Sequence, residues 1–512
     1  MRRGAAPGGP GRTGRHVVIV GAGPAGFAAA DWALAAGARV TLVDLADRPG
    51  GQYHRRPPGA PGPPSFERRR ARVLAHPRCA WRSRTAVWAL EQRDGDGDGG
   101  AGLPPLVHTL HGPADAADRP RAVLAPDALV LAPGAHDRVL PFPGWELPGV
   151  VTAGAAQALA KGQRVAVGRR VVVAGTGPFL LPVAASLLAA GARVREVCEA
   201  NGAGTLAAGW SHRPWQLAAA GGKAAELLRH TALLARHRVP FRTGRTVVEA
   251  RGEGRVEEVV TAALRPDWSV VPGSRRTLST DAVCVGHGFT PQLELPLAAG
   301  CALDGGFVAV DGAQRAGAPG VFAAGEITGV AGAPAARAEG ALAGWCAAGG
   351  DPAAPVLAPL RRARDQGRRF ARRLARAHPV GAEWPGWLRE DTVVCRCETA
   401  RYGALCAAAA DPASGDPRVG KLATRAGLGP CQARICGPAV AELTARLRGQ
   451  APPTDWTPHR RPIAQPIRLG ELARPARSTR DAEQEEHDPH APHGEHDPHG
   501  EHGEHGGRGQ RT

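Results

Sequence analysis

The stretch from Val17 to Asp44 constrains the fold of this chain more than any other part of its sequence. Four consecutive β-branched residues lead into the turn Gly-Ala-Gly-Pro-Ala-Gly, an Ala-rich helix follows, and a second apolar strand ends in an acid. The glycines of such a turn permit a tight bend and close approach of a pyrophosphate, and the helix N-terminus offers free N–H groups to phosphate oxygens. Asp44 stands 18 residues after Gly26, close to the spacing of about 20 expected for a carboxylate that binds an adenosine ribose. The stretch predicts a dinucleotide-binding fold, with a ligand-free strand, turn and helix as the alternative; its predicted contact residues are Gly21, Gly23, Pro24, Ala25, Gly26 and Asp44.

Four later segments add candidate residues to the same site. A Gly pair before a Gln can bring backbone N–H groups and an amide onto a ligand, and the strand at 85–90 offers its backbone to an adenine ring. The strand at 128–132 enters a Gly turn, and the strand at 319–324 ends in Gly-Glu at the predicted start of a helix. That Glu can accept from ribityl hydroxyls, and the helix N-terminus can stabilise negative charge on a reduced flavin, whereas a capped helix with an exposed Glu is the alternative. The added flavin-site residues are Gly51, Gln52, Val87, Gly134, Gly325 and Glu326.

Residues 170–199 repeat the opening pattern with one glycine missing. The strand enters a Gly175-Thr-Gly177 turn and the next strand ends in Glu199, but Leu180 stands where the third glycine is expected. This predicts a second Rossmann-like domain. The pattern leaves open whether Gly175 and Gly177 cradle a second nucleotide, NAD(P) or ATP/ADP-like, or whether the domain binds nothing or something else.

Composition narrows the function classes. Net charge is +17, but the arginines are scattered and are not gathered with aromatics on one face, which favours a solvated basic surface over nucleic-acid binding. The longest apolar stretch, 171–194, is interrupted by Gly and Pro, so no membrane span is predicted. The first 15 residues lack the apolar core of an export signal. With ten cysteines, we therefore expect a reducing, cytoplasmic compartment and free thiols or metal ligands, not disulfides.

Four cysteines near the C-terminus fall into two close pairs, a CxC and a CxxxxC separated by 33 residues. Four thiolates in two pairs suit an iron–sulfur cluster or zinc. Structural zinc pairs are usually CxxC or longer, so the spacing favours [2Fe–2S], with zinc and free thiols as the alternatives. Cys395, Cys397, Cys431 and Cys436 are the predicted ligands. The sequence shows no identifiable set of acid–base residues that would act on a substrate, so no catalytic residue is predicted.

These motifs, in this order, resemble the two-dinucleotide-binding-domain flavoproteins, and the cysteine segment resembles the bacterioferritin-associated-ferredoxin-like [2Fe–2S] domain. Together they look like the FAD-containing α or A subunits of heteromeric amino-acid and opine dehydrogenases, a group that includes hydrogen cyanide synthase, opine oxidase, D-hydroxyproline and L-proline dehydrogenase, and part of sarcosine oxidase α. The resemblance implies one FAD, a [2Fe–2S] cluster, an amino-acid-oxidase-like β flavoprotein partner and a small ferredoxin-like subunit. Pro133 departs from the family, which usually has Thr there. The disulfide reductases of the wider family use a CxxC, which this chain lacks, so a thiol–disulfide relay is not expected.

We therefore expect an α/β fold with nested Rossmann-like domains, a small helical [2Fe–2S] domain and a disordered tail. The expected FAD domain is discontinuous, over 15–145 and 282–350, with an NAD(P)-binding-like domain inserted at 146–281. A linker or helix at 351–389 and the [2Fe–2S] domain at 390–450 follow, and 1–14 and the Pro/Arg-rich, then His-rich 451–512 are expected to be disordered. The expected function is electron relay in a heteromeric amino-acid or amine dehydrogenase; an NAD(P)H-dependent reductase is the alternative.

Overall fold

The computed structural model describes residues 14–93, 102–212, 221–411, 417–451 and 463–476. The expectations for 1–13 and for the His-rich stretch after residue 480 lie outside the described residues.

A five-stranded parallel sheet carries the opening Gly turn. Its order is β20-β7-β1-β2-β3, and all four pairings are parallel. Side chains alternate along a strand, so Val17 and Ile19 of β1 pack in the core on one face while Val18 and Val20 pack in the core on the other. The strands are β1 (His16–Val20), β2 (Arg39–Val43), β3 (Cys79–Arg82), β7 (Ala128–Leu131) and β20 (Val321–Ala323).

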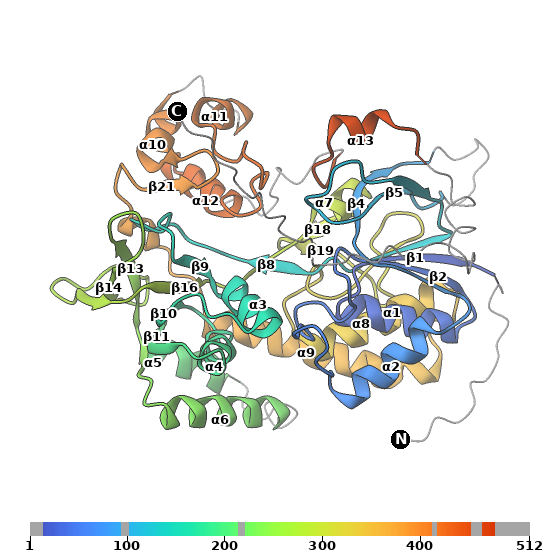
Figure 1. Cartoon of the computed structure of the whole chain (residues 1–512), viewed down its shortest axis with the longest axis horizontal. Helices are drawn as coiled ribbons and strands as arrows, with labels where there is room; N and C mark the ends of the chain where they lie inside the picture. The colour runs from blue at the N-terminus through green and yellow to red at the C-terminus, as the bar shows by residue number, and fades with distance from the viewer. Residues whose placement is uncertain (1–13, 94–101, 213–220, 412–416, 452–462, 477–512) are drawn as a thin grey trace, which may run out of the picture.

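Helices cover one face of this sheet, and two of them pack unusually closely (Figure 1). A Cβ on Gly340 would lie 1.9 Å from the Ala25 carbonyl oxygen, and one on Gly344 would lie 2.1 Å from the Ala29 carbonyl oxygen. Only glycine permits this contact between the backbones of α1 and α8. The helices of this domain are α1 (Pro24–Ala35), α2 (Pro64–Leu74) and α8 (Ala333–Ala347).

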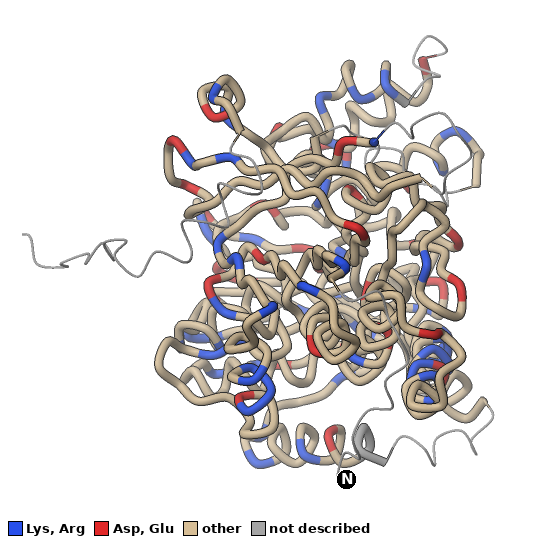
Figure 2. Tube along the Cα trace, turned by 90° about the vertical axis from the view of Figure 1, so that its right-hand side faces the viewer, with Lys and Arg blue, Asp and Glu red and all other residues tan. Residues whose placement is uncertain are grey.

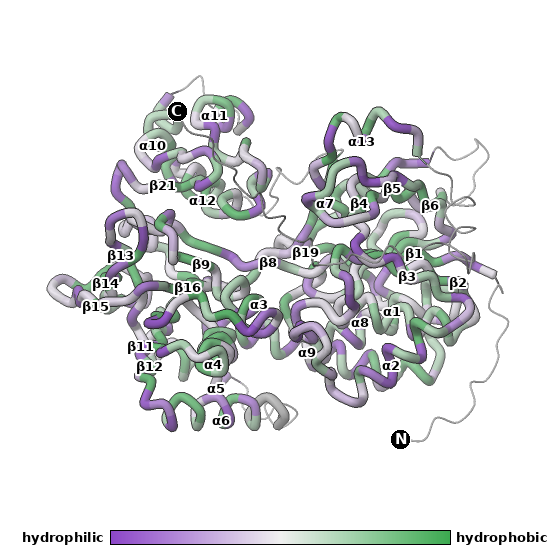
Figure 3. The backbone as a smooth tube through the Cα atoms, in the orientation of Figure 1, coloured by the Kyte–Doolittle hydropathy of each residue, from purple (hydrophilic) through white to green (hydrophobic). Residues whose placement is uncertain are grey.

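A second five-stranded parallel sheet has the order β12-β11-β10-β16-β9. Helix α4 is hydrophobic over most of its length, whereas hydrophobic and hydrophilic residues alternate along α6 (Figure 3). The strands are β9 (Val150–Thr152), β10 (Arg170–Gly175), β11 (Arg193–Glu199), β12 (Phe241–Thr243) and β16 (Ala282–Gly286), and the helices are α3 (Ala153–Gln163), α4 (Leu180–Ala189), α5 (Ala203–Ser211) and α6 (Gly221–Arg236).

Antiparallel strands complete both domains. One three-stranded sheet is β4-β5-β6 and another is β13-β14-β15; two-stranded pairs are formed by β8 with β17 and by β18 with β19. The β8–β17 pair runs between the two parallel sheets (Figure 1). The bounds are β4 (Thr85–Glu91), β5 (Leu106–His111), β6 (Arg121–Leu124), β8 (Ala135–Asp137), β13 (Arg245–Arg251), β14 (Glu258–Ala263), β15 (Arg276–Ser279), β17 (Phe289–Pro291), α7 (Glu294–Ala298), β18 (Leu303–Asp304) and β19 (Phe307–Val308).

The C-terminal part begins with a long Arg-rich helix, α9, and continues into the cysteine segment. The cysteine segment combines a short hairpin with three helices that stand above the second domain in Figure 1. The bounds are η2 (Pro355–Leu357), α9 (Ala358–Ala377), η3 (Trp384–Trp387), β21 (Val393–Cys395), β22 (Ala400–Arg401), α10 (Tyr402–Ala410), α11 (Pro417–Thr424), α12 (Gly437–Leu447) and α13 (Leu469–Ala473).

Two details differ from the expected domain boundaries. Strand β16, which we expected to resume the first domain at residue 282, pairs with β10 and β9 in the second sheet. Residues 463–476 fall within the segment expected to be disordered, yet they are ordered against β4–β6. The Ala464 N–H donates to the Trp88 carbonyl at 2.7 Å, and the buried Glu471 carboxylate pairs with Arg119 at 2.7 Å. The composition of this segment predicted disorder, because composition cannot show that Glu471 would be buried and paired with Arg119.

Candidate redox site

The first Gly turn has the backbone that a diphosphate requires. Gly21 has φ +96°, and a Cβ there would lie 2.2 Å from the Ala132 carbonyl oxygen. A Cβ on Gly26 would lie 1.7 Å from the Gly21 carbonyl oxygen, so the helix starts against the turn. Gly23 is the N-cap of α1, Pro24 its first residue, and no side chain caps this end. The N-terminus of a 12-residue helix thus remains available to an anion.

Gly51, from the loop after β2, lies directly on this turn. A Cβ on Gly51 would lie 2.9 Å from the Gly23 Cα, and the Gly50 N–H donates to the Ala22 carbonyl at 2.8 Å. The neighbouring Gln52 is exposed. The structure thus brings the Gly51 backbone to the turn, with the Gln52 side chain at the surface.

Asp44 follows β2 directly, and its carboxylate accepts the Ala22 N–H at 2.5 Å and the Ala46 N–H at 2.7 Å. Burial raises the pKa of Asp44 above its usual value, against the opposing effect of the two N–H donors. The side chain is partly exposed. Each carboxylate oxygen has a second lone pair that could accept a ribose hydroxyl, so the ribose role stays a prediction.

Gly325 and Glu326 lie close to α1, but the helix that follows them starts later than expected. A Cβ on Gly325 would lie 2.9 Å from the Ala25 Cβ, which places this turn against the start of α1. Helix α8 begins at Ala333, seven residues beyond Glu326, with Gly332 as its N-cap. The Glu326 carboxylate accepts the Gly332 N–H at 3.2 Å and so approaches the helix N-terminus through space.

Two further predicted residues occupy opposite environments. Val87 is buried within β4, beside an irregularity in its pairing with β5. Gly134 has φ +83° and open space where a side chain would stand. Sequence reasoning missed Gln292, which holds this turn: its N–H donates to the Gly134 carbonyl at 3.0 Å and its side-chain amide to the Pro133 carbonyl at 3.1 Å. The open face of Gly134 therefore has a fixed orientation.

The second Gly turn has the same backbone form, but its acid is fully engaged. Gly175 has φ +142° and Gly177 has φ +100°. The Glu199 carboxylate is 2% exposed and accepts from the Thr176 hydroxyl at 2.9 Å and from the Gly177 N–H at 2.8 Å. His378, from the end of α9, lies 3.1 Å from the same carboxylate.

Other residues close the space around Glu199 further. The Asn201 N–H donates to this carboxylate at 3.0 Å, and its side-chain amide donates to the Pro379 carbonyl at 3.1 Å. The Trp268 indole N–H lies 3.4 Å from the Asn201 amide oxygen. Although burial opposes ionisation, the hydrogen bond and charge of His378 and the backbone donors lower the pKa of Glu199. Sequence spacing could not reveal these partners, because His378 is 179 residues from Glu199.

The structure brings the four predicted cysteine ligands together. The Cys436 thiol hydrogen-bonds with Cys395 and with Cys431, and Cys431 hydrogen-bonds with Cys397, so the four sulfurs lie together. Backbone N–H groups approach the sulfurs; that of Gly427 lies 3.5 Å from the Cys395 Sγ. Such donors stabilise thiolates and sulfur clusters.

Two of these thiols ionise readily. The hydrogen bond with Cys436 lowers the pKa of Cys395 to about 6 and that of Cys431 to about 5, against the effect of burial. The same hydrogen bonds raise the pKa of Cys436 well above its usual value, and burial raises that of Cys397. Among the described residues, no three His, Cys, Asp or Glu side chains are arranged as a single-ion site.

Five of the other six cysteines behave as buried thiols. Burial raises the pKa of Cys79 and Cys346 to about 11 and that of Cys301 to about 12. Burial also raises the pKa of Cys198 and Cys284. All ten cysteines are unpaired by disulfides. The low-pKa thiols therefore belong to the four-cysteine group.

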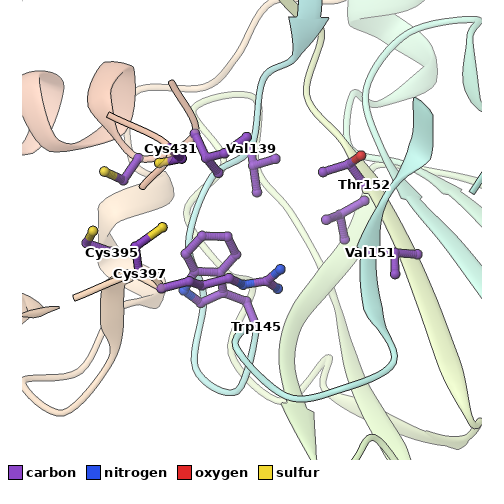
Figure 4. Close-up of a pocket in the computed structure, with 11 residues that line it drawn as sticks. Val139, Trp145, Val151, Thr152, Cys395, Cys397 and Cys431 are labelled. Carbon is purple, nitrogen blue, oxygen red and sulfur yellow. The ribbon is translucent and has the colours of Figure 1, made fainter. Parts of the chain in front are cut away.

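A cavity of about 170 Å³ adjoins the cysteines and separates them from β9 (Figure 4). The Arg396 guanidinium, from within the CxC, projects into this region with its Cζ 4.1 Å from the centre of the Trp145 ring. The cavity is lined by Val139, Trp145, Val151, Thr152, Val285, Cys395, Arg396, Cys397, Cys431, Ile435 and Cys436. Sequence spacing could not reveal Trp145 as the stacking partner of Arg396, because the two residues lie far apart in the chain.

A short strand connects the two candidate redox sites. Strand β8 starts immediately after Gly134, and its His136 Nε2 lies 2.7 Å from the carbonyl oxygen of Arg434, within the CxxxxC loop. Arg138 donates to the Glu442 carboxylate of α12 at 2.8 Å. The Arg434 guanidinium in turn pairs with Glu294 at 2.7 Å. The flavin-side turn and the cysteine loop are thus fixed to one another.

Comparison with known proteins defines the class. Residues 15–340 match the family model described as pyridine nucleotide-disulphide oxidoreductase, and the chain belongs to this family. It is an FAD-dependent oxidoreductase of the group that contains the A subunits of opine oxidases and the HcnB subunits of hydrogen cyanide synthases.

Three particular relatives show the extent of the likeness. The opine oxidase A protein of Rhizobium meliloti is 32% identical over 90% of this chain and 87% of its own length. The HcnB protein of the Pseudomonas aeruginosa hydrogen cyanide synthase is 33% identical over 87% of this chain and 96% of its own length. The solved structure of L-proline dehydrogenase from P. horikoshii superimposes with a TM-score of 0.58 and 19% identity, over 90% of this chain and 80% of that one, a likeness of fold. No helix among the described residues is long and apolar enough to cross a membrane.

Proposed function

We propose that this chain is the electron-relaying subunit of a heteromeric amino-acid or amine dehydrogenase or oxidase. In this proposal an amino-acid-oxidase-like β flavoprotein oxidises a substrate of the proline, hydroxyproline, opine, glycine or sarcosine type. This chain receives the electrons, and a small ferredoxin-like subunit completes the complex. Relatives that match this chain over most of their own length are named as subunits of an opine oxidase and of hydrogen cyanide synthase, which supports the proposal.

The residues present fit both redox groups. The uncapped N-terminus of α1, with the Gly51 backbone beside it, suits a flavin nucleotide diphosphate. Four thiols that lie together, with backbone donors, suit a [2Fe–2S] cluster, and among the described residues no three His, Cys, Asp or Glu side chains are arranged to hold a single zinc ion. When bound, a flavin exchanges two electrons and such a cluster one at a time.

The observation that carries the proposal is the β8 connection. The turn at Gly134 and the loop between Cys431 and Cys436 are joined through His136 and Arg434 at 2.7 Å. Electron relay requires two centres held at a fixed separation, and this link supports such an arrangement.

Glu199 argues against the alternative, an NAD(P)H-dependent reductase. A Rossmann domain binds its nucleotide ribose through this acid. Here the carboxylate is buried and engaged by Thr176, Gly177, Asn201 and His378. Binding of NAD(P)H in the usual mode would have to displace His378.

Metal analysis of cysteine variants tests the proposal. Anaerobically purified protein is expected to hold FAD and about two irons and two sulfides per chain. Cys395→Ser and Cys431→Ser are each expected to lose most of the iron and the cluster absorbance while retaining FAD, because each removes one of four ligands. Cys406→Ser, in the same segment but outside the group of four cysteines, is the matched control. A single zinc in the wild-type protein, or iron retained in both ligand variants, would contradict the cluster assignment.

A further inference from the structure

Positive charges from three elements surround the loop that follows Gly51. Arg55 belongs to this loop, Lys161 lies on α3 of the second domain, and Arg337 lies on α8 of the first. Lys161 is notable in a chain that has only three lysines among 64 basic residues. Cations therefore converge where the two domains meet beside the first Gly turn.

Lys161 and Arg337 both contact Tyr53, a neutral residue. Lys161 Nζ donates to the Tyr53 carbonyl at 3.2 Å, and the Arg337 Cζ lies 5.9 Å from the centre of the Tyr53 ring. The Arg55 side chain lies against α3, with its Cδ 3.5 Å from where a Cβ on Gly162 would stand. Arg56 differs, because its guanidinium pairs with Glu67.

These like charges act on one another. Burial, together with the charges of Arg337, Arg56 and Lys161, lowers the pKa of His54 to about 4. Burial, followed by the charge of Arg55, lowers the pKa of Lys161. Two acids lie nearby: Glu67 pairs with Arg56 and Arg70, and Asp44 accepts two backbone N–H groups and, against the larger effect of burial, has its pKa lowered by the charge of Arg55. An anion bound among Arg55, Lys161 and Arg337 would relieve this repulsion.

Phosphate is the anion class that these side chains suit best. Guanidinium groups donate to phosphate oxygens through paired N–H groups, and an ammonium adds a compact point charge. Gly51, four residues before Arg55, lies on Gly23 at the N-terminus of α1, so the same region offers unpaired backbone donors.

We propose that Arg55, Lys161 and Arg337 form a phosphate-binding site that spans the two domains. The phosphate groups have two sources, the diphosphate of the FAD or a separate phosphorylated ligand. The first source rests on the proposed FAD site, whereas the second does not.

Calorimetric titration with inorganic pyrophosphate tests the site in FAD-free and FAD-loaded protein, both in phosphate-free buffer. The double variant Lys161→Met/Arg337→Met is expected to weaken pyrophosphate binding to FAD-free protein by about tenfold or more, because the two charged donors together contribute at least about that factor. Arg362→Met/Arg369→Met, two exposed arginines of α9, removes the same charge as the matched control and is expected to bind like the wild type. Lys161→Arg/Arg337→Lys keeps the charges and is expected to retain binding.

The FAD-loaded arm identifies the source. If the FAD diphosphate occupies the site, pyrophosphate binds only FAD-free protein, and the Met variant also loses FAD on gel filtration. If a separate ligand occupies it, pyrophosphate still binds FAD-loaded protein and raises the His54 pKa in an NMR titration. Equal pyrophosphate affinity in the folded Met variant and the α9 control would overturn the site. The titration of FAD-free protein tests the phosphate site by itself, so its result can be interpreted even if the protein does not bind FAD.

Discussion

Glu199 and His54 have opposite electrostatic environments. Glu199 is buried with its charge satisfied by donors from its own turn and from His378. His54 is stacked on Phe66, with ring centres 4.0 Å apart, and faces cations with little compensation. The first arrangement balances the carboxylate charge within the protein, whereas the second leaves positive charge that an anion would balance.

The pH dependence of stability is expected to report on His54. Its pKa is about 4 in the folded protein, against 6.5 for an unperturbed histidine. Between these values the unfolded chain binds a proton that the folded chain does not, so stability falls as the pH is lowered through this window and the loss is complete below about 4. His54→Gln removes this contribution. Urea unfolding at pH 7, 5 and 4 in phosphate-free buffer is expected to show the wild type losing more free energy than the variant; parallel losses would show that His54 is not responsible.

At the scale of elements, close helix packing holds the flavin-side turns in place. Gly340 and Gly344 allow α8 to lie directly on the backbone of α1, whose N-terminus is the predicted diphosphate site. The Gly325 turn touches Ala25 at the same end of α1. Packing between two helices thus determines where three predicted contact segments meet.

Gly340→Ala is expected to destabilise the first domain, although alanine is the better helix former. The added Cβ would lie 1.9 Å from the Ala25 carbonyl oxygen, and such overpacking costs on the order of 3 kcal/mol. Gly204→Ala in α5 is the matched control, because no atom lies within 4 Å of its new Cβ and the change gains up to about 1 kcal/mol of helix propensity. Thermal unfolding, with FAD retention measured in parallel, is expected to shift in opposite directions for the two variants. A Gly340→Ala protein as stable as the wild type would show that α1 and α8 can move apart.

Local elements were predictable because their signals are local. The β-branched run of β1, the GxGxxG turn and the acid after β2 follow one another within 28 residues, and the structure places them as predicted. The four cysteines were predicted from spacing alone and do converge. The sheet to which β16 belongs, and the burial of Glu471 against Arg119, depend on partners far away in sequence and could not be read from either segment.

At the scale of the whole molecule, two Rossmann-like domains and a cysteine segment meet around β8. Basic and acidic residues are interspersed along the chain without one continuous basic face in the view of Figure 2, and the absence of nucleic-acid binding stays a prediction. The second domain keeps its fold, while His378 and Pro379 of the following segment occupy the region of its ribose acid. The segment that follows α9 therefore packs against the acid of the second Gly turn.

The organisation of the second domain predicts which reductants can reduce the flavin of this chain under anaerobic conditions. Neither NADH nor NADPH is expected to bleach the flavin of the isolated chain, because Glu199 is already bonded within the protein. Co-expression with an amino-acid-oxidase-like partner, followed by addition of its substrate, is expected to bleach it. Stopped-flow absorbance distinguishes the two routes, with dithionite as the control for a reducible flavin. Rapid bleaching by NADPH alone would restore the reductase alternative.

The hydrogen bond between His136 and Arg434 has a mechanical consequence. Because β8 leaves the Gly134 turn without an intervening loop, the hydrogen bond from His136 ties the CxxxxC loop to the backbone next to that turn. If these two places hold the proposed cluster and flavin, a rearrangement of the cysteine loop on loading or loss of the cluster would shift the backbone beside the flavin.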